Sequence, residues 1–365
     1  MHITAQIIGI PYKPKLTSNL KVFNFEDFNI NTLPANCIID YDGFSFGLSK
    51  WVSPKRTRSY PYERVYNTLG TAKRITVIPV IKDEGKGGDR DFIQWDTVSL
   101  MSLLDVFVVF GYYKIAEKHK TQTNKVTNQQ FDNEWVKIKI QEIKNYHSSA
   151  LHWNLKEIKE SFPELIQKAK FSYDKIGKQL GVEFHNNKGI NKFANQFING
   201  VRNFMNTSRE KAQQAQRREM LTVQPKEVLS TLTKATITIE NFLGGKYYFT
   251  IDEIRIKENK IFLIETKHSK SLLLPSIRDI KDGLLKMILY VNLTNVTISK
   301  KKYQPVPILK LTSPKLIKRM RIRTYKNLNE CITLHNFTIR QKEIMEKLFV
   351  EAKENKFDII LERAE

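Results

Sequence analysis

The chain has 365 residues, of which 41% are hydrophobic and 11% aromatic, and this composition excludes an intrinsically disordered protein. Its 60 Lys and Arg residues outnumber 38 Asp and Glu residues, and the formal charge of +22 predicts a polyanionic partner such as nucleic acid. The two cysteines, Cys37 and Cys331, are too few and too far apart for a zinc ribbon or a disulfide scaffold, which indicates a reducing compartment.

The N-terminal residues lack the basic region of a signal peptide. The longest apolar run, residues 103–113, is far shorter than the roughly 20 residues that span a bilayer. We therefore expect a cytoplasmic protein without a membrane segment.

Residues 1–160 are predicted to form a mixed α/β region. "NCIIDYDGFSFG" and "RITVIPVIK" are typical of strands, and "DEGKGGDRD" of a Gly-rich loop. From Thr97, "TVSLMSLLDVFVVFGYYKIAEK" is apolar nearly all round and predicts a buried helix capped by Asp96 or Thr97. Residues 131–146 have helical periodicity, and residues 161–224 form a charged helical segment.

Residues 225–312 change from a charged helical pattern to a pattern of short strands. "ATITIENF", "KYYFTIDEIRI" and "KIFLIETKH" predict three consecutive strands, with Glu258 and Asn259 turning the second pair. A helix is expected after Pro275, followed by the further strands "NVTISKK" and "PVPILKL". Residues 313–365 are predicted to hold a basic strand and an amphipathic helix over 337–356.

The third strand ends in Glu265, Thr266 and Lys267. Side chains alternate along a strand, so Glu265 and Lys267 point the same way, with Cα atoms about 7 Å apart, and Thr266 points the other way. Asp252 lies 13 residues upstream, across a tight connection, and a hairpin brings it opposite Glu265. Two carboxylates and one ammonium group are therefore expected at one place.

This trio suits metal-assisted hydrolysis of a phosphodiester. Mg²⁺ prefers oxygen ligands, which Asp252, Glu265 and the backbone carbonyl of Thr266 supply, and it acidifies a bound water. Lys267 would stabilise the developing charge or orient that water. Acid-x-lysine at a strand end also occurs by chance on surface hairpins, so the pattern alone leaves a purely structural interpretation open.

"TIDEIRIKENKIFLIETK" resembles the signature of the PD-(D/E)XK nucleases over residues 225–295. The resemblance implies that Asp252 is the first acid, Glu265 the second and Lys267 the lysine. Ile251 replaces the family's proline, which leaves Glu253 as a neighbouring candidate. Glu227 matches the acid that often lies on the preceding helix, with Glu240 as a substitute.

The resemblance implies a mixed α+β fold with a restriction-endonuclease-like core, in which helices flank a central mixed sheet and further segments are mostly helical. The longer chain also resembles bacterial type II restriction endonucleases. This implies cleavage of double-stranded DNA at a specific sequence with Mg²⁺, a homodimer, and a cognate DNA methyltransferase as genetic partner.

Three other functions stay open. The chain is alternatively a repair or defence nuclease directed by DNA structure, or a non-catalytic nucleic-acid-binding protein whose acids only pair with lysines. A membrane-surface protein is the least favoured, because no basic amphipathic helix with exposed aromatics is present.

DNA contacts are expected from cations at three places. Arg and Lys neutralise phosphates, Arg reads guanine edges, and aromatic rings stack on bases. The first stretch, 50–66, interleaves both types and alternatively forms a basic surface loop over packed tyrosines; its candidates are Lys50, Lys55, Arg56, Arg58, Tyr60 and Arg64. Lys270 and Arg278 follow the predicted site. The densest basic run, 313–326, suits phosphate contact or a solvated edge strand.

Overall fold

The computed structural model describes residues 1–55, 61–198, 203, 204, 206, 210, 214, 233–242 and 246–364. The chain divides into two compact units, of which unit 1 comprises Met1–Ser18 with Lys211–Glu365, and unit 2 comprises Asn19–Glu210. The expected boundaries at 160, 224 and 312 do not coincide with this division. The reason is that strands near both ends of the chain, His2–Ile7, Met320–Ile322 and Asp358–Arg363, join one sheet.

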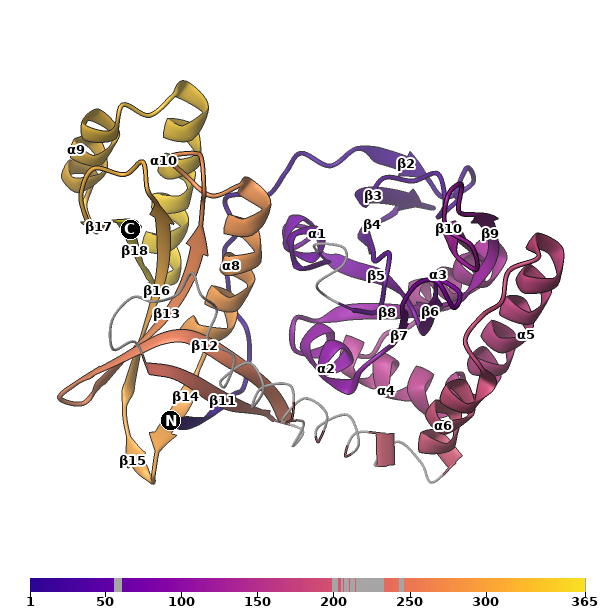
Figure 1. Cartoon of the computed structure of the whole chain (residues 1–365). Coiled ribbons are helices and arrows are strands. Elements are labelled where there is room, and N and C mark those ends of the chain that lie inside the picture. Colours follow the sequence, from indigo (N-terminus) through magenta and orange to yellow (C-terminus); the bar gives the residue numbers. More distant parts are fainter. Residues whose placement is uncertain are drawn as a thin grey trace. The chain divides into compact units, whose positions relative to one another are not determined.

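Unit 1 is built on a nine-stranded mixed sheet in the order β15-β14-β1-β11-β12-β13-β16-β18-β17 (Figure 1). Its strands are β1 His2–Ile7, β11 Thr233–Asn241, β12 Lys246–Lys257, β13 Lys260–His268, β14 Thr294–Ile298, β15 Lys301–Lys302, β16 Gln304–Ser313, β17 Met320–Ile322 and β18 Asp358–Arg363. Its helices are α8 Ile277–Val291, α9 Tyr325–His335 and α10 Ile339–Asn355. The expected mixed α+β class, with helices flanking a large mixed sheet, is confirmed.

The centre of this sheet follows the expected strand order. β11, β12 and β13 form an antiparallel meander, and β16 then returns parallel to β13 after the crossover through α8. Glu258 turns the β12–β13 connection with a left-handed φ of 56°, and α8 begins after Pro275 with Ser276 as its N-cap, accepting a hydrogen bond from the Asp279 amide at 3.2 Å. These three local predictions are confirmed.

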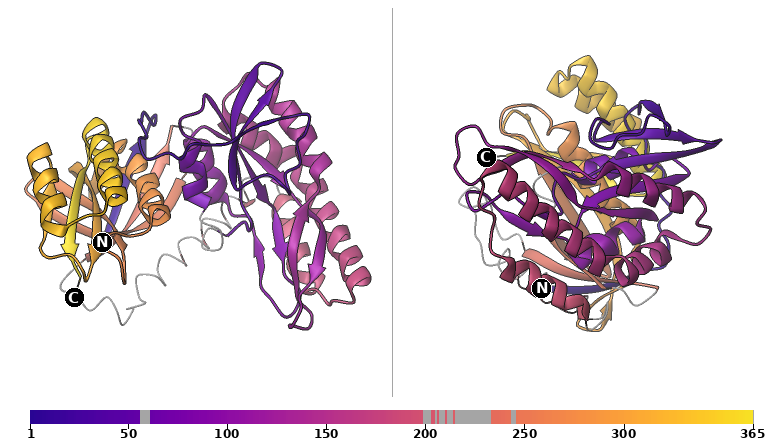
Figure 2. Two further views of the ribbon diagram at one scale, coloured as in Figure 1. Left: turned by 90° about the horizontal axis from the view of Figure 1, so that it is seen from above. Right: turned by 90° about the vertical axis from the view of Figure 1, so that its right-hand side faces the viewer.

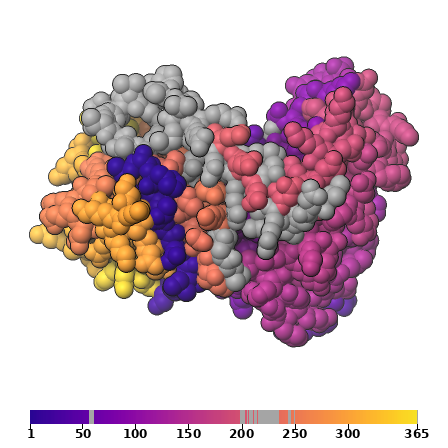
Figure 3. Space-filling model, turned by 90° about the horizontal axis from the view of Figure 1, so that it is seen from below, coloured from indigo at the N-terminus to yellow at the C-terminus, as the bar shows by residue number. Residues whose placement is uncertain are grey.

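One strand of the sheet comes from the opposite end of the chain. β1 inserts between β11, to which it is parallel, and β14, to which it is antiparallel. The indigo N-terminal segment in Figure 3 lies between the orange segments of the same unit. Alternate residues of β1 are fully buried, as expected for a strand with one face on a core.

The helices of unit 1 pack against four adjacent strands of the sheet, β13, β16, β18 and β17. α8 lies on β13 and β16, α10 on β18, and α9 on β17 and α10. The core under α8 is apolar and fully buried; it includes Leu263, Leu309, Leu311, Ile280, Leu284, Met287 and Ile288. A crossover helix buried along its whole inner face is rigid, and it holds its few polar residues at defined places over the sheet.

Unit 2 contains a five-stranded sheet in the order β2-β3-β4-β5-β8 and two separate hairpins, β6-β7 and β9-β10. Its strands are β2 Val22–Asn24, β3 Asn36–Tyr41, β4 Phe44–Lys50, β5 Lys73–Pro79, β6 Ile81–Asp83, β7 Arg90–Phe92, β8 Val106–Gly111, β9 Tyr113–Lys118 and β10 Val126–Phe131. Its helices are α1 Pro61–Asn67, α2 Trp95–Leu103, α3 Asn133–Lys144, α4 Ala150–Glu160, α5 Phe162–Leu180 and α6 Asn187–Ile198. The magenta and rose helices lie along one side of the purple strands in the left view of Figure 2.

The prediction of a long buried helix from Thr97 is wrong. The helix starts earlier, at Trp95, and ends at Leu103, and neither Asp96 nor Thr97 is its N-cap, which is Gln94. Asp105, with a φ of 52°, turns the chain into the fully buried strand β8. The β-branched and aromatic run "VFVVF" packs better in a central strand than in a helix, and an all-round apolar pattern does not distinguish the two.

Candidate active site

The two residues of the acid-x-lysine pattern lie side by side on one face of β13. The Nζ atom of Lys267 is 3.0 Å from Oε1 of Glu265, and the two side chains are 15% and 1% exposed. His268 points to the other face, where its Nδ1 lies 3.1 Å from the Thr312 hydroxyl. The alternation predicted for this strand is therefore present, and the pair is buried and not on a solvated hairpin.

Asp252 reaches the same place from β12. The paired residues of β12 and β13 end at Glu253 and Ile264. Beyond this pair, the backbone amide of Thr266 donates a hydrogen bond to Oδ2 of Asp252 at 2.8 Å. The carboxylate of Asp252 therefore lies beside the backbone between Glu265 and Lys267.

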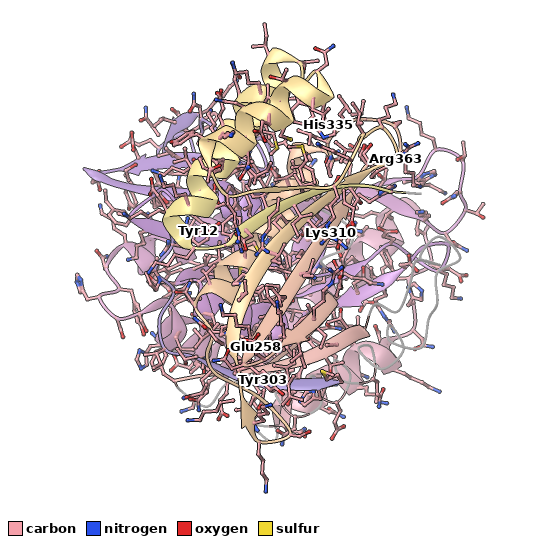
Figure 4. The ribbon with its side chains drawn as sticks, turned by 90° about the vertical axis from the view of Figure 1, so that its left-hand side faces the viewer. Tyr12, Glu258, Tyr303, Lys310, His335 and Arg363 are labelled. Carbon is pink, nitrogen blue, oxygen red and sulfur yellow. The ribbon has the colours of Figure 1, made fainter. Side chains whose placement is uncertain are left out.

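Glu253, the neighbouring candidate for the first acid, lies on the opposite face of the sheet. It forms ion pairs with Lys310 and with Arg255, whose Nη2 is 2.5 Å from Oε1 of Glu253. Figure 4 looks onto this face and labels Lys310 between the turn at Glu258 and the end of β18 at Arg363. Asp252 and not Glu253 therefore shares a face with Glu265.

Helix α8 adds two residues to the group. Oδ2 of Asp282 is 2.6 Å from Nζ of Lys267, and Nζ of Lys286 is 2.7 Å from Oε2 of Glu265. Residues four apart share one face of a helix, so both side chains point at β13. Asp282 was not among the predicted site residues. The available signal was a charged pair at this spacing in the otherwise apolar stretch "DGLLKMILYV".

Gly283 allows this close approach of α8 to β13. A Cβ atom at Gly283 would lie 2.9 Å from Cδ1 of Leu309 and 3.1 Å from Cε of Lys267. Glycine in a helix interior is unfavourable by itself, by about 1 kcal/mol relative to alanine. Here the missing side chain makes room for the aliphatic stem of Lys267.

The charges of the site do not balance. Among the described residues, the carboxylates of Asp252, Glu265 and Asp282 face the ammonium groups of Lys267 and Lys286, and these five groups by themselves carry a net charge of −1. Burial raises the pKa of Glu265, and Asp252 adds to this, against the opposing effects of both lysines. The site as a whole therefore favours one more positive charge.

Lys267 is protonated in this setting. Burial by itself lowers the pKa of its ammonium group, but Glu265 and Asp282 outweigh burial and raise that pKa above its usual value. Lys267 is therefore suited to hold negative charge and to orient a water molecule, and it is not suited to accept a proton near neutral pH.

The residues present fit a Mg²⁺ ion with few protein ligands. Asp252 and Glu265 are adjacent hard oxygen donors in a group with excess negative charge, and Mg²⁺ commonly takes one or two carboxylates and keeps several waters. Within the described part of the chain, no three His, Cys, Asp or Glu residues are close enough to hold a metal together. Asp282 contacts the ammonium group of Lys267.

The cations predicted to bind DNA are placed differently from one another. Lys270 and Arg278, which follow β13 and begin α8, are exposed. Glu227, Arg56, Arg58 and Tyr60 lie outside the described residues. Lys55, in unit 2, is exposed.

Lys50 and Arg64 of unit 2 bind the backbone of their own unit. Nζ of Lys50 donates to the carbonyl oxygen of Ile30 at 2.6 Å, and Nη1 of Arg64 donates to that of Lys50 at 2.6 Å. Burial lowers the pKa of Lys50 to about 8, with Cys37 opposing this and Arg64 adding to it. Lys50 is therefore half-buried with its ammonium group on the backbone of unit 2, and its contact with DNA stays a prediction.

The basic run 313–326 lies partly in ion pairs. Arg321 and Arg323 both contact Asp358, the latter at 3.1 Å, and Arg319 lies 3.6 Å from Glu362. The acids of β18 therefore offset part of the positive charge that predicted phosphate contacts here.

Comparisons with known protein families, with curated proteins and with solved structures found no match for this chain. None of the described helices is both long and apolar enough to cross a membrane.

Proposed function

We propose that the protein is a Mg²⁺-dependent endonuclease that hydrolyses phosphodiester bonds of double-stranded DNA. The observation that carries the proposal is the convergence of Asp252, Glu265 and Lys267 on one face of β12 and β13. Cleavage of a specific sequence, as in type II restriction, is the form that the resemblance favours, and a homodimer would allow both strands to be cut.

Each residue has a distinct role in this proposal. Asp252 and Glu265 would hold the metal, which supplies a polarised phosphoryl group and an acidified water when it is bound. Lys267 would hold the charge that develops on the phosphoryl oxygen. Asp282 would keep the Lys267 ammonium over β13, and Lys270 and Arg278, both exposed, would bind the flanking phosphates.

A plasmid digest tests the proposal. Purified protein is incubated with plasmid DNA in Mg²⁺ and in EDTA, beside the variants Lys267→Met and Lys260→Met. Lys260 is a matched control, because it is exposed at the other end of the same strand. Discrete bands that require both Mg²⁺ and Lys267, but not Lys260, are the expected result.

Other results would change the conclusion in defined ways. A smear that requires Mg²⁺ and Lys267 would retain the catalytic site but replace sequence-specific restriction by a repair or defence nuclease. DNA binding without any cleavage, on plasmids of varied sequence and methylation, would indicate that the acids serve only as partners of the lysines.

A further inference from the structure

The group around Glu265 contains a cation that the proposed reaction does not use. Both carboxylate oxygens of Glu265 are occupied, Oε1 by Lys267 at 3.0 Å and Oε2 by Lys286 at 2.7 Å. The Lys267 ammonium is also held by Asp282 at 2.6 Å. Lys286 is the cation from α8, and its ammonium contacts Oε2, the oxygen that Lys267 leaves free.

A metal ligand must present at least one oxygen to the metal. Glu265 is 1% exposed and Lys286 is 8% exposed, so neither side chain can turn into bulk solvent at low cost. A divalent ion on either oxygen of Glu265 would therefore lie against a lysine ammonium group, and repulsion between the two cations would move that ammonium group away. Lys286 has the weaker hold, because Lys267 is fixed by two carboxylates.

We infer that Lys286 is an internal counter-cation for Glu265 that a divalent metal ion displaces, and that its charge makes metal binding depend on DNA. This inference rests on the proposed metal site and deepens it. With Lys286 present the group carries −1, and a divalent ion brings it to +1. A phosphodiester, with one negative charge, then restores neutrality.

The charge count gives opposite expectations for the free protein with and without Lys286. The wild-type group becomes positive on binding a divalent ion, so the ion binds weakly until a phosphodiester arrives. A group without the Lys286 charge carries −2, and the ion alone neutralises it. The ammonium group thus acts against premature metal binding, at low dielectric, where one unit charge has a large effect.

The experiment measures Mn²⁺ binding to the full chain without DNA, by calorimetry and by the electron paramagnetic resonance signal of free Mn²⁺. Lys286→Gln keeps a hydrogen-bond donor to Glu265 but loses the charge. We expect it to bind Mn²⁺ at least about tenfold more tightly than the wild type. Lys286→Arg keeps the charge and should retain the weak wild-type affinity.

Lys281→Met is the matched control, because Lys281 is buried on the same helix but its Nζ donates to the Ser18 hydroxyl at 2.7 Å. It should bind Mn²⁺ as the wild type does. The temperature of unfolding gives a second measurement: Mn²⁺ should raise it more for Lys286→Gln than for the wild type. Should Lys286→Gln not fold in EDTA, its recovery by Mn²⁺ is the expected result.

Equal Mn²⁺ affinity of Lys286→Gln and the wild type would overturn the inference, as would failure of Mn²⁺ to recover an unfolded variant. These outcomes are independent of the proposed function, which the plasmid digest of the wild type tests. A wild type that cuts DNA, beside a Lys286→Gln variant with unchanged affinity, would retain the nuclease and remove only the role of Lys286.

Discussion

Loss of the Glu265 charge should destabilise the protein as well as inactivate it, and the two effects can be separated. Glu265→Leu leaves the Lys286 ammonium, which is 8% exposed, without its carboxylate. Breaking a buried ion pair by removing one partner costs about 3–5 kcal/mol. Whole domains are stable by only about 5–15 kcal/mol, so an inactive Glu265→Leu variant alone would say little about catalysis.

The double variant Glu265→Leu/Lys286→Met resolves this difficulty. It replaces the pair by apolar side chains of similar volume and leaves the ion pair of Lys267 with Asp282 intact. Such replacements of buried pairs are often neutral or stabilising. We therefore expect the double variant to recover most of the stability, with a coupling free energy of about 3 kcal/mol or more between the two sites.

The assay combines unfolding in urea, followed by far-ultraviolet circular dichroism, with plasmid cleavage at a temperature where all variants are folded. The double variant should be as stable as the wild type, should bind DNA, and should not cut it. A single variant that loses less than about 1 kcal/mol would contradict the buried ion pair, given the magnitudes above. A double variant that still cuts DNA would refute the role of Glu265 as a metal ligand.

Three further predictions concern packing, the opposite face of the sheet, and pH. Gly283→Ala should lower the free energy of unfolding by about 1 kcal/mol and reduce cleavage, because the new methyl group displaces Lys267. The cost of this displacement is larger than the gain in helix propensity. A variant that is more stable than the wild type in urea unfolding would exclude the close approach of α8 to β13. Lys310→Met should lower the free energy of unfolding by about 3 kcal/mol, because it leaves the buried carboxylate of Glu253, which is 1% exposed, with Arg255 alone. Urea unfolding measures this loss, with Lys257→Met as the control at an exposed residue. Burial lowers the pKa of Lys50 to about 8. Between pH 8 and about 10.4, Lys50 is therefore protonated in the unfolded chain but not in the folded protein. The wild type should gain stability relative to Lys50→Met as pH rises through this window. Parallel stability curves for these two proteins would argue against the burial of a charged Lys50.

The strands and the helix that carry the candidate site are predictable from local sequence. Alternation along "KIFLIETKH" places Glu265 and Lys267 on one face, and the two residues Glu258 and Asn259 between two strands specify a hairpin. These features depend only on neighbours in the chain, and for that reason the predictions agreed with the structure. The same alternation places Asp252 and Glu253 on opposite faces of β12, as the structure has them.

The tertiary structure decided which charges meet. Asp282 and Lys286 are ordinary polar residues of a helix until α8 crosses β13, and Gly283 is a weak helix residue until Lys267 packs on it. The pairing of β1 with β11 joins residues more than two hundred positions apart, and no local pattern encodes it. Only the fold likewise shows that the half-buried Lys50 donates to the backbone of unit 2, because the free energy of a charge depends on what surrounds it in space.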